Sequence, residues 1–262
     1  MTASASDRSR RWERARRVAF FVWAAVLTTL VGVTFAAVTI LTVGMWLAGQ
    51  NSTTNPVTDL GFFALGGIII TMGLAAQIRA PEQRIAGVQQ AAIGLLALGV
   101  AGLIGTRIEP LVGSLIFLVA TAVLVALHPA RGAFLRLGTR PSAPLTVLSI
   151  LACIPATAYA ATMLVQARQA GPSCFFGGCA YGDRLAEMAA LALAIAVAGT
   201  LAAFRPRGWR LTAWSVGVSA AVVGSASIVL PEAPGSLGQL GGALALAWGV
   251  LFAVLSERRM DH

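Results

Sequence analysis

The chain has 262 residues, of which 57% are apolar and only 11% are charged, and its mean hydropathy is +0.80. Soluble domains carry about 25% charged residues, because a surface that faces water must be solvated. The composition therefore excludes an ordinary soluble protein and predicts that most of the surface faces lipid. All nineteen basic residues are arginines, and the absence of lysine excludes Schiff-base chemistry of the kind that retinal proteins use.

Long apolar stretches, interrupted by clusters of Arg, Pro or Gly, follow one another along the whole chain. A helix needs about 20 apolar residues to cross a hydrocarbon core of about 30 Å. The chain is therefore predicted to be all-α, a polytopic integral membrane bundle with no soluble domain. Its eight expected transmembrane helices are 18–48, 60–78, 85–105, 111–128, 144–166, 185–204, 211–230 and 237–256.

The placement of the arginines predicts the orientation, because basic flanks of membrane helices stay in the cytoplasm. With the N-terminus inside, sixteen arginines fall in cytoplasmic segments, and the Arg-rich segment 1–17 holds six of them. We therefore expect a plasma-membrane protein whose N-terminus and C-terminal tail, residues 257–262, are both cytoplasmic. The net charge of +9 then forms a rim against anionic headgroups, and nucleic acid is not an expected partner. The outer arginines are Arg107, Arg168 and Arg184.

Two parts of the chain, 59–128 and 185–254, align as copies of one unit at an offset of 126 residues. An Arg-x4-Arg pair and an acid–proline turn recur in both copies. This predicts two parallel halves, about 18–128 and 144–256, related by a pseudo-two-fold axis along the membrane normal. The matching residues are Arg79 and Arg84 with Arg205 and Arg210, followed by Glu109 with Glu232.

Several short strings carry a resemblance to a known group of proteins. They are LHPARG (127–132), PATAYAA (155–161), GWRLTAW (208–214) and PEAPGSLG (231–238). The chain resembles uncharacterised multi-pass membrane proteins of high-GC actinobacteria, over most of its length from about residue 58. The resemblance implies a bacterial multi-pass protein and no particular activity. Similar chains carry His and Trp just before the sixth span, and Asp183 to Glu187 contains neither, so no histidine-based site is implied here.

Polar groups inside a bilayer are costly and therefore often functional. No carboxylate, His or Arg falls near the centre of an expected span, which makes a proton-coupled carrier or pump less expected. Gln89 and Gln90 stand in the third span, where they fit helix packing or ligand binding. Pro155 predicts a kink in the fifth span, which shapes either the packing or a cavity.

Half of the ten acidic residues are expected at outer helix ends, together with the outer arginines. Asp183 and Glu187 are spaced i, i+4 and so share a helix face. Such a cluster fits a site for a metal, an amine or a lipid headgroup, or acid–base work on an outer substrate. It fits ordinary solvated helix ends better, because acids are favoured at the N-termini of helices. The residues are Asp59, Glu109, Asp183, Glu187 and Glu232.

Cys174 and Cys179 lie in the longest outer loop, separated by four residues that include a Gly pair. A disulfide is permitted there, outside the cytoplasm. A metal site would need further ligands, and both His128 and His262 are expected on the cytoplasmic side. Haem usually takes two axial ligands, and no second one accompanies His128. We therefore expect no metal, no cofactor and no catalytic residue.

These patterns favour a multi-pass membrane protein that binds or transports a small apolar or lipidic ligand held between its halves. The alternative is a non-catalytic accessory protein that contacts a membrane partner or a second copy of itself. Its contact faces would be Gly66 with Gly67 and Gly238 with Gly242, which fit internal packing equally well. A membrane enzyme that uses the outer acids is a third and less favoured interpretation.

Overall fold

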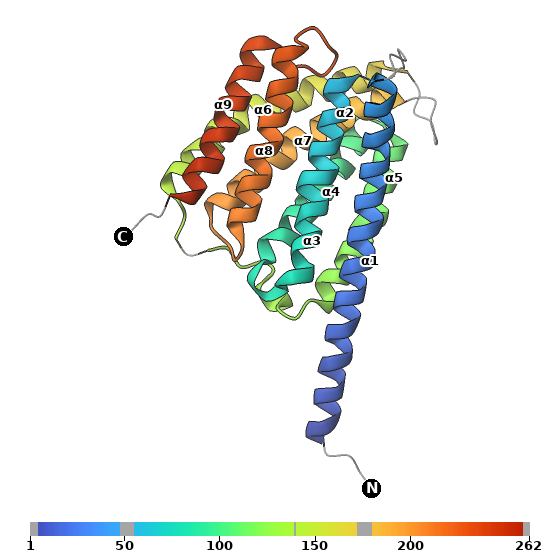
Figure 1. Cartoon of the computed structure of the whole chain (residues 1–262), viewed down its shortest axis with the longest axis vertical. Helices are drawn as coiled ribbons and strands as arrows, with labels where there is room; N and C mark the ends of the chain where they lie inside the picture. The colour runs from blue at the N-terminus through green and yellow to red at the C-terminus, as the bar shows by residue number, and fades with distance from the viewer. Residues whose placement is uncertain (1–4, 48–54, 139, 172–179, 259–262) are drawn as a thin grey trace.

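The structure, a computed structural model, describes residues 5–47, 55–138, 140–171 and 180–258. All regular elements in these residues are helical, and eight helices are long and apolar enough to cross a membrane. Figure 1 shows the helices standing side by side in one bundle. The predicted all-α, multi-pass fold is confirmed.

The spans follow the predicted order, and most of their ends lie within a few residues of the expected ones. Two single turns of 3-10 helix, η2 (Pro81–Gln83) and η3 (Arg131–Ala133), connect spans at the arginine-rich end of the bundle. The spans are α1 (Ala5–Leu47), α2–η1–α3 (Pro56–Arg79), α4 (Ile85–Ile104), α5 (Ile108–Leu127), α6 (Ala143–Gln169), α7 (Ala180–Ala203), α8 (Trp209–Val229) and α9 (Gly238–Glu257).

The first helix begins at Ala5, well before the expected start at residue 18. Its early turns contain Arg, Glu and Ala, which are good helix formers in a polar environment. The 43 residues of α1 span about 64 Å, roughly twice the thickness of a hydrocarbon core. In Figure 1 its N-terminal part extends beyond the rest of the bundle. Most of the Arg-rich segment is therefore a helical continuation of the first span.

The second span is irregular at its centre. Asn55 caps α2 (Pro56–Phe63) by accepting a hydrogen bond from the Val57 N–H at 3.1 Å. The helix then widens into the π-helix η1 (Ala64–Thr71) before α3 (Met72–Arg79) continues. The ring of Phe35 on α1 lies against Gly66, where any side chain would collide. The widened turn is therefore one of the places where the first span packs onto the second.

Half of the spans form the inside of the bundle and half its periphery. The most apolar stretch of 18 residues is 56–67% buried in α2–η1–α3, α4, α7 and α8. In α1, α5, α6 and α9 it is only 22–28% buried. Apolar side chains such as Ile154 of α6 and Leu240 of α9 point outward and are largely exposed. An apolar surface of this extent needs lipid around it. The peripheral helices are therefore the lipid-facing side of a multi-pass membrane protein.

Glycines bring neighbouring helices into backbone contact. Gly224 of α8 faces Gly242 of α9, and a Cβ atom on Gly242 would lie 2.7 Å from the Gly224 carbonyl oxygen. Gly217 and Gly249 meet in the same way about two turns further along. Of the two uses left open for Gly242 and Gly66, the structure shows internal packing for both.

The turns between spans meet at the arginine-rich end. The Ala86 N–H donates to the Arg207 carbonyl at 3.0 Å, which joins the two turns that hold the matching Arg-x4-Arg pairs. The Thr212 hydroxyl donates to the Ala86 carbonyl at 3.4 Å, and these residues are 126 positions apart, the offset of the expected repeat. Residues that touch their own equivalents lie on a two-fold axis. The contact supports the repeat, which stays a prediction.

Candidate functional site

A cavity of about 400 Å³ lies among α6, α7, α8 and α9. Pockets that hold small molecules commonly enclose about 300–1,000 Å³ and are lined mainly by apolar side chains. The lining here is almost wholly apolar and contains no charged residue. The lining residues include Leu151, Ala152, Pro155, Tyr159, Met188, Ile195, Val223, Leu237, Gly241, Ala245 and Trp248.

Small residues on the two peripheral helices leave this space open. Ala152 and Ala156 of α6 face Gly241 and Ala245 of α9 across the cavity, and none of them is long enough to fill it. The Trp248 indole N–H donates to the Leu148 carbonyl at 3.0 Å, which holds α9 against α6. The cavity therefore lies between lipid-facing helices, with the inner helices α7 and α8 behind it.

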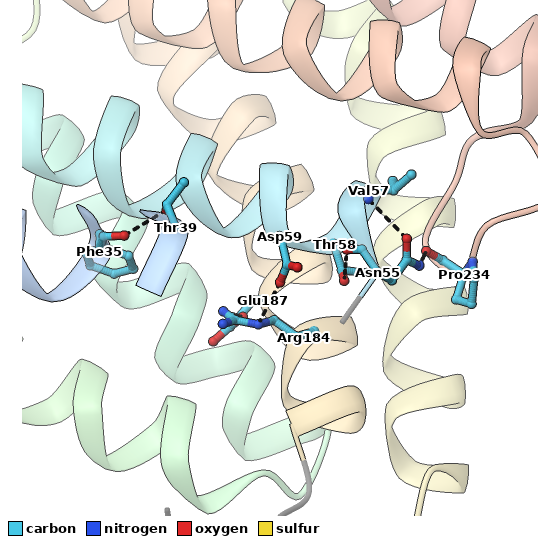
Figure 2. Close-up of polar contacts among 9 residues, drawn as sticks. All are labelled: Phe35, Thr39, Asn55, Val57, Thr58, Asp59, Arg184, Glu187 and Pro234. Atoms are coloured by element: carbon cyan, nitrogen blue, oxygen red, sulfur yellow. Dashed lines mark hydrogen bonds and ion pairs between the residues drawn. The ribbon is translucent and has the colours of Figure 1, made fainter. Parts of the chain in front are cut away.

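The end of the bundle opposite the arginine-rich turns is hereafter called the outer end, after the orientation expected from the sequence. At this end the cavity carries a polar group. The Tyr159 hydroxyl donates to the Gly235 carbonyl, in the turn between α8 and α9. Gly235 has a φ of 77°, a left-handed conformation that favours glycine. Figure 2 shows the neighbouring Pro234 carbonyl accepting a hydrogen bond from Asn55 at the start of α2. This turn thus joins the cavity wall to the second span.

Pro155 lies inside α6 and lines the cavity. Proline has no N–H, so the carbonyl of Leu151 loses its helical donor. Leu151 itself lines the cavity. No protein-family model, curated protein or solved structure matches this chain. The lining of the cavity is therefore the guide to the kind of molecule that it could hold.

Part of the expected acidic cluster forms a buried ionic network at the outer end, shown in Figure 2. Arg184 of α7 lies 3.5 Å from the Asp59 carboxylate of α2 and 2.8 Å from that of Glu187. Its guanidinium also covers the ring of Phe62 at 3.9 Å. Both carboxylates are only 8% exposed. The network ties α2 to α7 and is separate from the lining of the cavity.

A second buried pair joins Arg107, just before α5, to Asp183 of α7. The Arg107 Nε atom lies 4.0 Å from an Asp183 oxygen, and the guanidinium donates to the Ala167 carbonyl of α6. It rests on Gly182, where no side chain fits. The sequence analysis does not predict that Arg107 and Arg184 form buried ion pairs between helices. The available signal was that Arg107 and Arg184 are exceptions to the strong arginine bias, which a structural ion pair explains.

The other expected site residues do not join these pairs. Glu109 and Glu232 are exposed and form no ion pair within the described residues. In the same part of the chain, no three His, Cys, Asp or Glu side chains are placed to hold a metal ion. Cys174 and Cys179 lie outside the described residues. The acids thus divide into a buried structural set and two separate surface residues.

Gln89 and Gln90 are both buried in α4 and both donate to backbone carbonyls. The Gln90 amide donates to Ile69 at 2.6 Å, inside the π-helical turn, and the Gln89 amide donates to Phe134 after η3. Neither side chain lines the cavity. Both side chains therefore take part in packing between helices, and their role in ligand binding stays a prediction.

His128 follows α5 at the arginine-rich end and is 4% exposed. Its Nδ1 atom accepts the Ala130 N–H at 3.0 Å, so Nε2 carries the proton and faces the Gln77 oxygen at 3.2 Å. Burial lowers the pKa of His128 below 6.5, opposed by the Pro81 backbone and the charge of Glu82. The ring is a neutral packing residue, and no sequence pattern indicated its partner Gln77.

Proposed function

We propose that this chain binds a small apolar or lipidic ligand in the cavity between α6 and α9. The observation that carries the proposal is an uncharged space of about 400 Å³ between two lipid-facing helices. A ligand dissolved in the bilayer reaches such a space without crossing water. The sequence analysis predicts a ligand held between the two halves of the chain. The cavity differs from this expectation, because all its lining residues belong to the second half, 144–256.

The lining also limits the chemistry of the ligand. Transfer of an unpaired charge into an apolar cavity is very costly, so a charged group would not enter. A hydrocarbon body fits the side chains of Leu151, Ile195 and Val223, and a single hydroxyl would satisfy the carbonyl that Pro155 leaves free. A fatty alcohol or an isoprenoid alcohol combines these features.

Filling the cavity tests the proposal. Ala245→Phe places a ring among the lining residues, whereas Ala243→Phe places the same ring on the exposed face of the same helix. Native mass spectrometry of the gently solubilised wild-type protein should show a co-purified apolar molecule, and a fluorescent fatty alcohol should bind in a saturable way. The Ala245→Phe variant should lose both, and the Ala243→Phe variant should keep both.

Other outcomes of the same experiment favour the alternatives. Equal probe binding by the wild type and both variants would contradict a ligand site in this cavity. A protein that carries only a different polypeptide would favour the accessory interpretation. An activity that disappears with Asp183→Asn or Glu187→Gln, while probe binding persists, would favour a membrane enzyme that uses the outer acids.

Membrane and orientation belong to the same proposal. We place the protein in a bacterial plasma membrane, with both termini in the cytoplasm, because the arginines of the inter-span turns gather at one end. The Ala86–Arg207 and Ser142–Ala203 hydrogen bonds, at 3.0 and 2.8 Å, hold three of these turns together.

A further inference from the structure

A second cavity, of about 280 Å³, lies at the arginine-rich end between α1 and the end of α3. Arg17 and Phe20 line it from α1, and Arg79 and the η2 turn line it from the second span. It shares no lining residue with the apolar cavity. We propose that this second cavity binds the phosphate group of an anionic phospholipid.

The charges of the cavity favour an anion. Arg17 reaches Glu82 only at 3.8 Å, and both side chains are more than half exposed, so the pair is weak. Arg79 has no acidic partner within the described residues. The lining therefore keeps a positive charge. Two guanidinium groups from different helices are suited to phosphate, because each can donate two parallel hydrogen bonds to its oxygens.

The position of the cavity favours a phosphate that belongs to a lipid. Arg79 ends the second span, and after Arg17 the sequence of α1 becomes apolar. The cavity thus lies where the apolar part of the bundle meets its arginine-rich end, which is the depth of a phosphate in a bilayer. Phe21, which lines the cavity, and Val22, which follows it on α1, are 42% and 58% exposed. These side chains offer a surface along which acyl chains can continue.

Titration with defined lipids tests this site. The purified full-length protein is titrated with phosphatidylglycerol or phosphatidylcholine, and bound lipid is counted by native mass spectrometry. Arg79→Gln should weaken phosphatidylglycerol binding about fivefold, the effect expected for one arginine near a charged surface. The matched control is Arg136→Gln, an exposed arginine that does not line the cavity, and it should bind as the wild type does.

A second variant gives the opposite sign. Glu82→Gln removes the carboxylate that competes for Arg17, so phosphatidylglycerol should bind more tightly than to the wild type. Because Arg79 and Glu82 are both exposed, neither substitution removes a buried contact. Equal binding of phosphatidylglycerol to the wild type, Arg79→Gln and Arg136→Gln would overturn the proposal.

Glycerol phosphate distinguishes a lipid from a free phosphate. It carries the same phosphate chemistry without acyl chains. If the wild type binds it as tightly as phosphatidylglycerol, with the same dependence on Arg79, the site takes a soluble phosphate and the lipid assignment is wrong. If only the lipid binds, the assignment stands. Ala245→Phe should leave phosphatidylglycerol binding unchanged. The proposal for the apolar cavity and the proposal for the phosphate site are therefore tested independently.

Discussion

At the scale of single residues, the chain buries arginines and carboxylates at the outer end of its bundle. Arg184 holds Asp59 and Glu187 at 3.5 and 2.8 Å, and all three are largely withdrawn from solvent. A buried ion pair adds little stability compared with apolar residues of the same shape. Removal of one partner, by contrast, leaves an uncompensated buried charge and is strongly destabilising.

Arg184→Met is therefore expected to destabilise the protein by about 3–5 kcal/mol, because two buried carboxylates lose their common partner. The triple variant Arg184→Met, Asp59→Asn, Glu187→Gln should recover most of this loss. Thermal unfolding in detergent, followed by circular dichroism, measures the difference. A triple variant as unstable as the single one would show that the contact with Phe62 matters more than the charges.

His128 makes stability depend on pH. Its folded-state pKa is lowered by burial from 6.5, so below pH 6.5 the unfolded chain binds the proton more readily than the folded one. The free energy of unfolding therefore falls as the pH decreases through this range. Protonation of Nδ1 would also displace the Ala130 N–H that it accepts.

The unfolding temperature of the wild type should thus fall more steeply than that of His128→Gln between pH 7.5 and pH 5.5. His128→Gln removes the titrating group and should show a smaller fall, with a lower stability at pH 7.5. If the unfolding temperatures of the wild type and His128→Gln change with pH in parallel, other titrating groups cause the pH dependence.

At the scale of the helices, close glycine contacts decide where a Cβ atom is tolerated. Gly242→Ala should cost about 1–3 kcal/mol, as overpacking does, because the added atom meets the Gly224 carbonyl at 2.7 Å. Gly113→Ala in α5 meets nothing within 4 Å and should gain about 0.5–1 kcal/mol from helix propensity. In chemical unfolding in mixed micelles, the free energy of unfolding should therefore decrease for Gly242→Ala and increase for Gly113→Ala. A decrease in both variants would contradict this packing.

The limits of the helices were largely predictable from the sequence, because about 20 apolar residues between charged turns define a span. Two features were not. The helical start of α1 at Ala5 needs no apolar pattern, and no sequence pattern indicates the π-helix of the second span, where Phe35 of α1 lies against Gly66. Hydropathy carries no information about contacts between helices.

At the scale of the whole molecule, the candidate cavity was hidden from sequence analysis for the same reason. Its wall combines residues from Leu151 to Trp248 on four helices, and only Pro155 had been singled out. The expected ligand residues Gln89 and Gln90 serve packing. Polarity marks costly groups inside a bilayer, but an apolar site is made of ordinary residues and becomes visible only when the helices are assembled.

The orientation of the bundle is the remaining property of the whole molecule, and it can be measured directly. In a background where Cys153, Cys174 and Cys179 are replaced by serine, Gly132→Cys places a thiol in the arginine-rich η3 turn and Glu232→Cys places one in the opposite turn. Both positions are exposed. Because arginine-rich turns stay inside, a membrane-impermeant maleimide should label Glu232→Cys on intact cells and Gly132→Cys only after permeabilisation. The reverse pattern would invert the topology and would place the proposed phosphate site on the outer face.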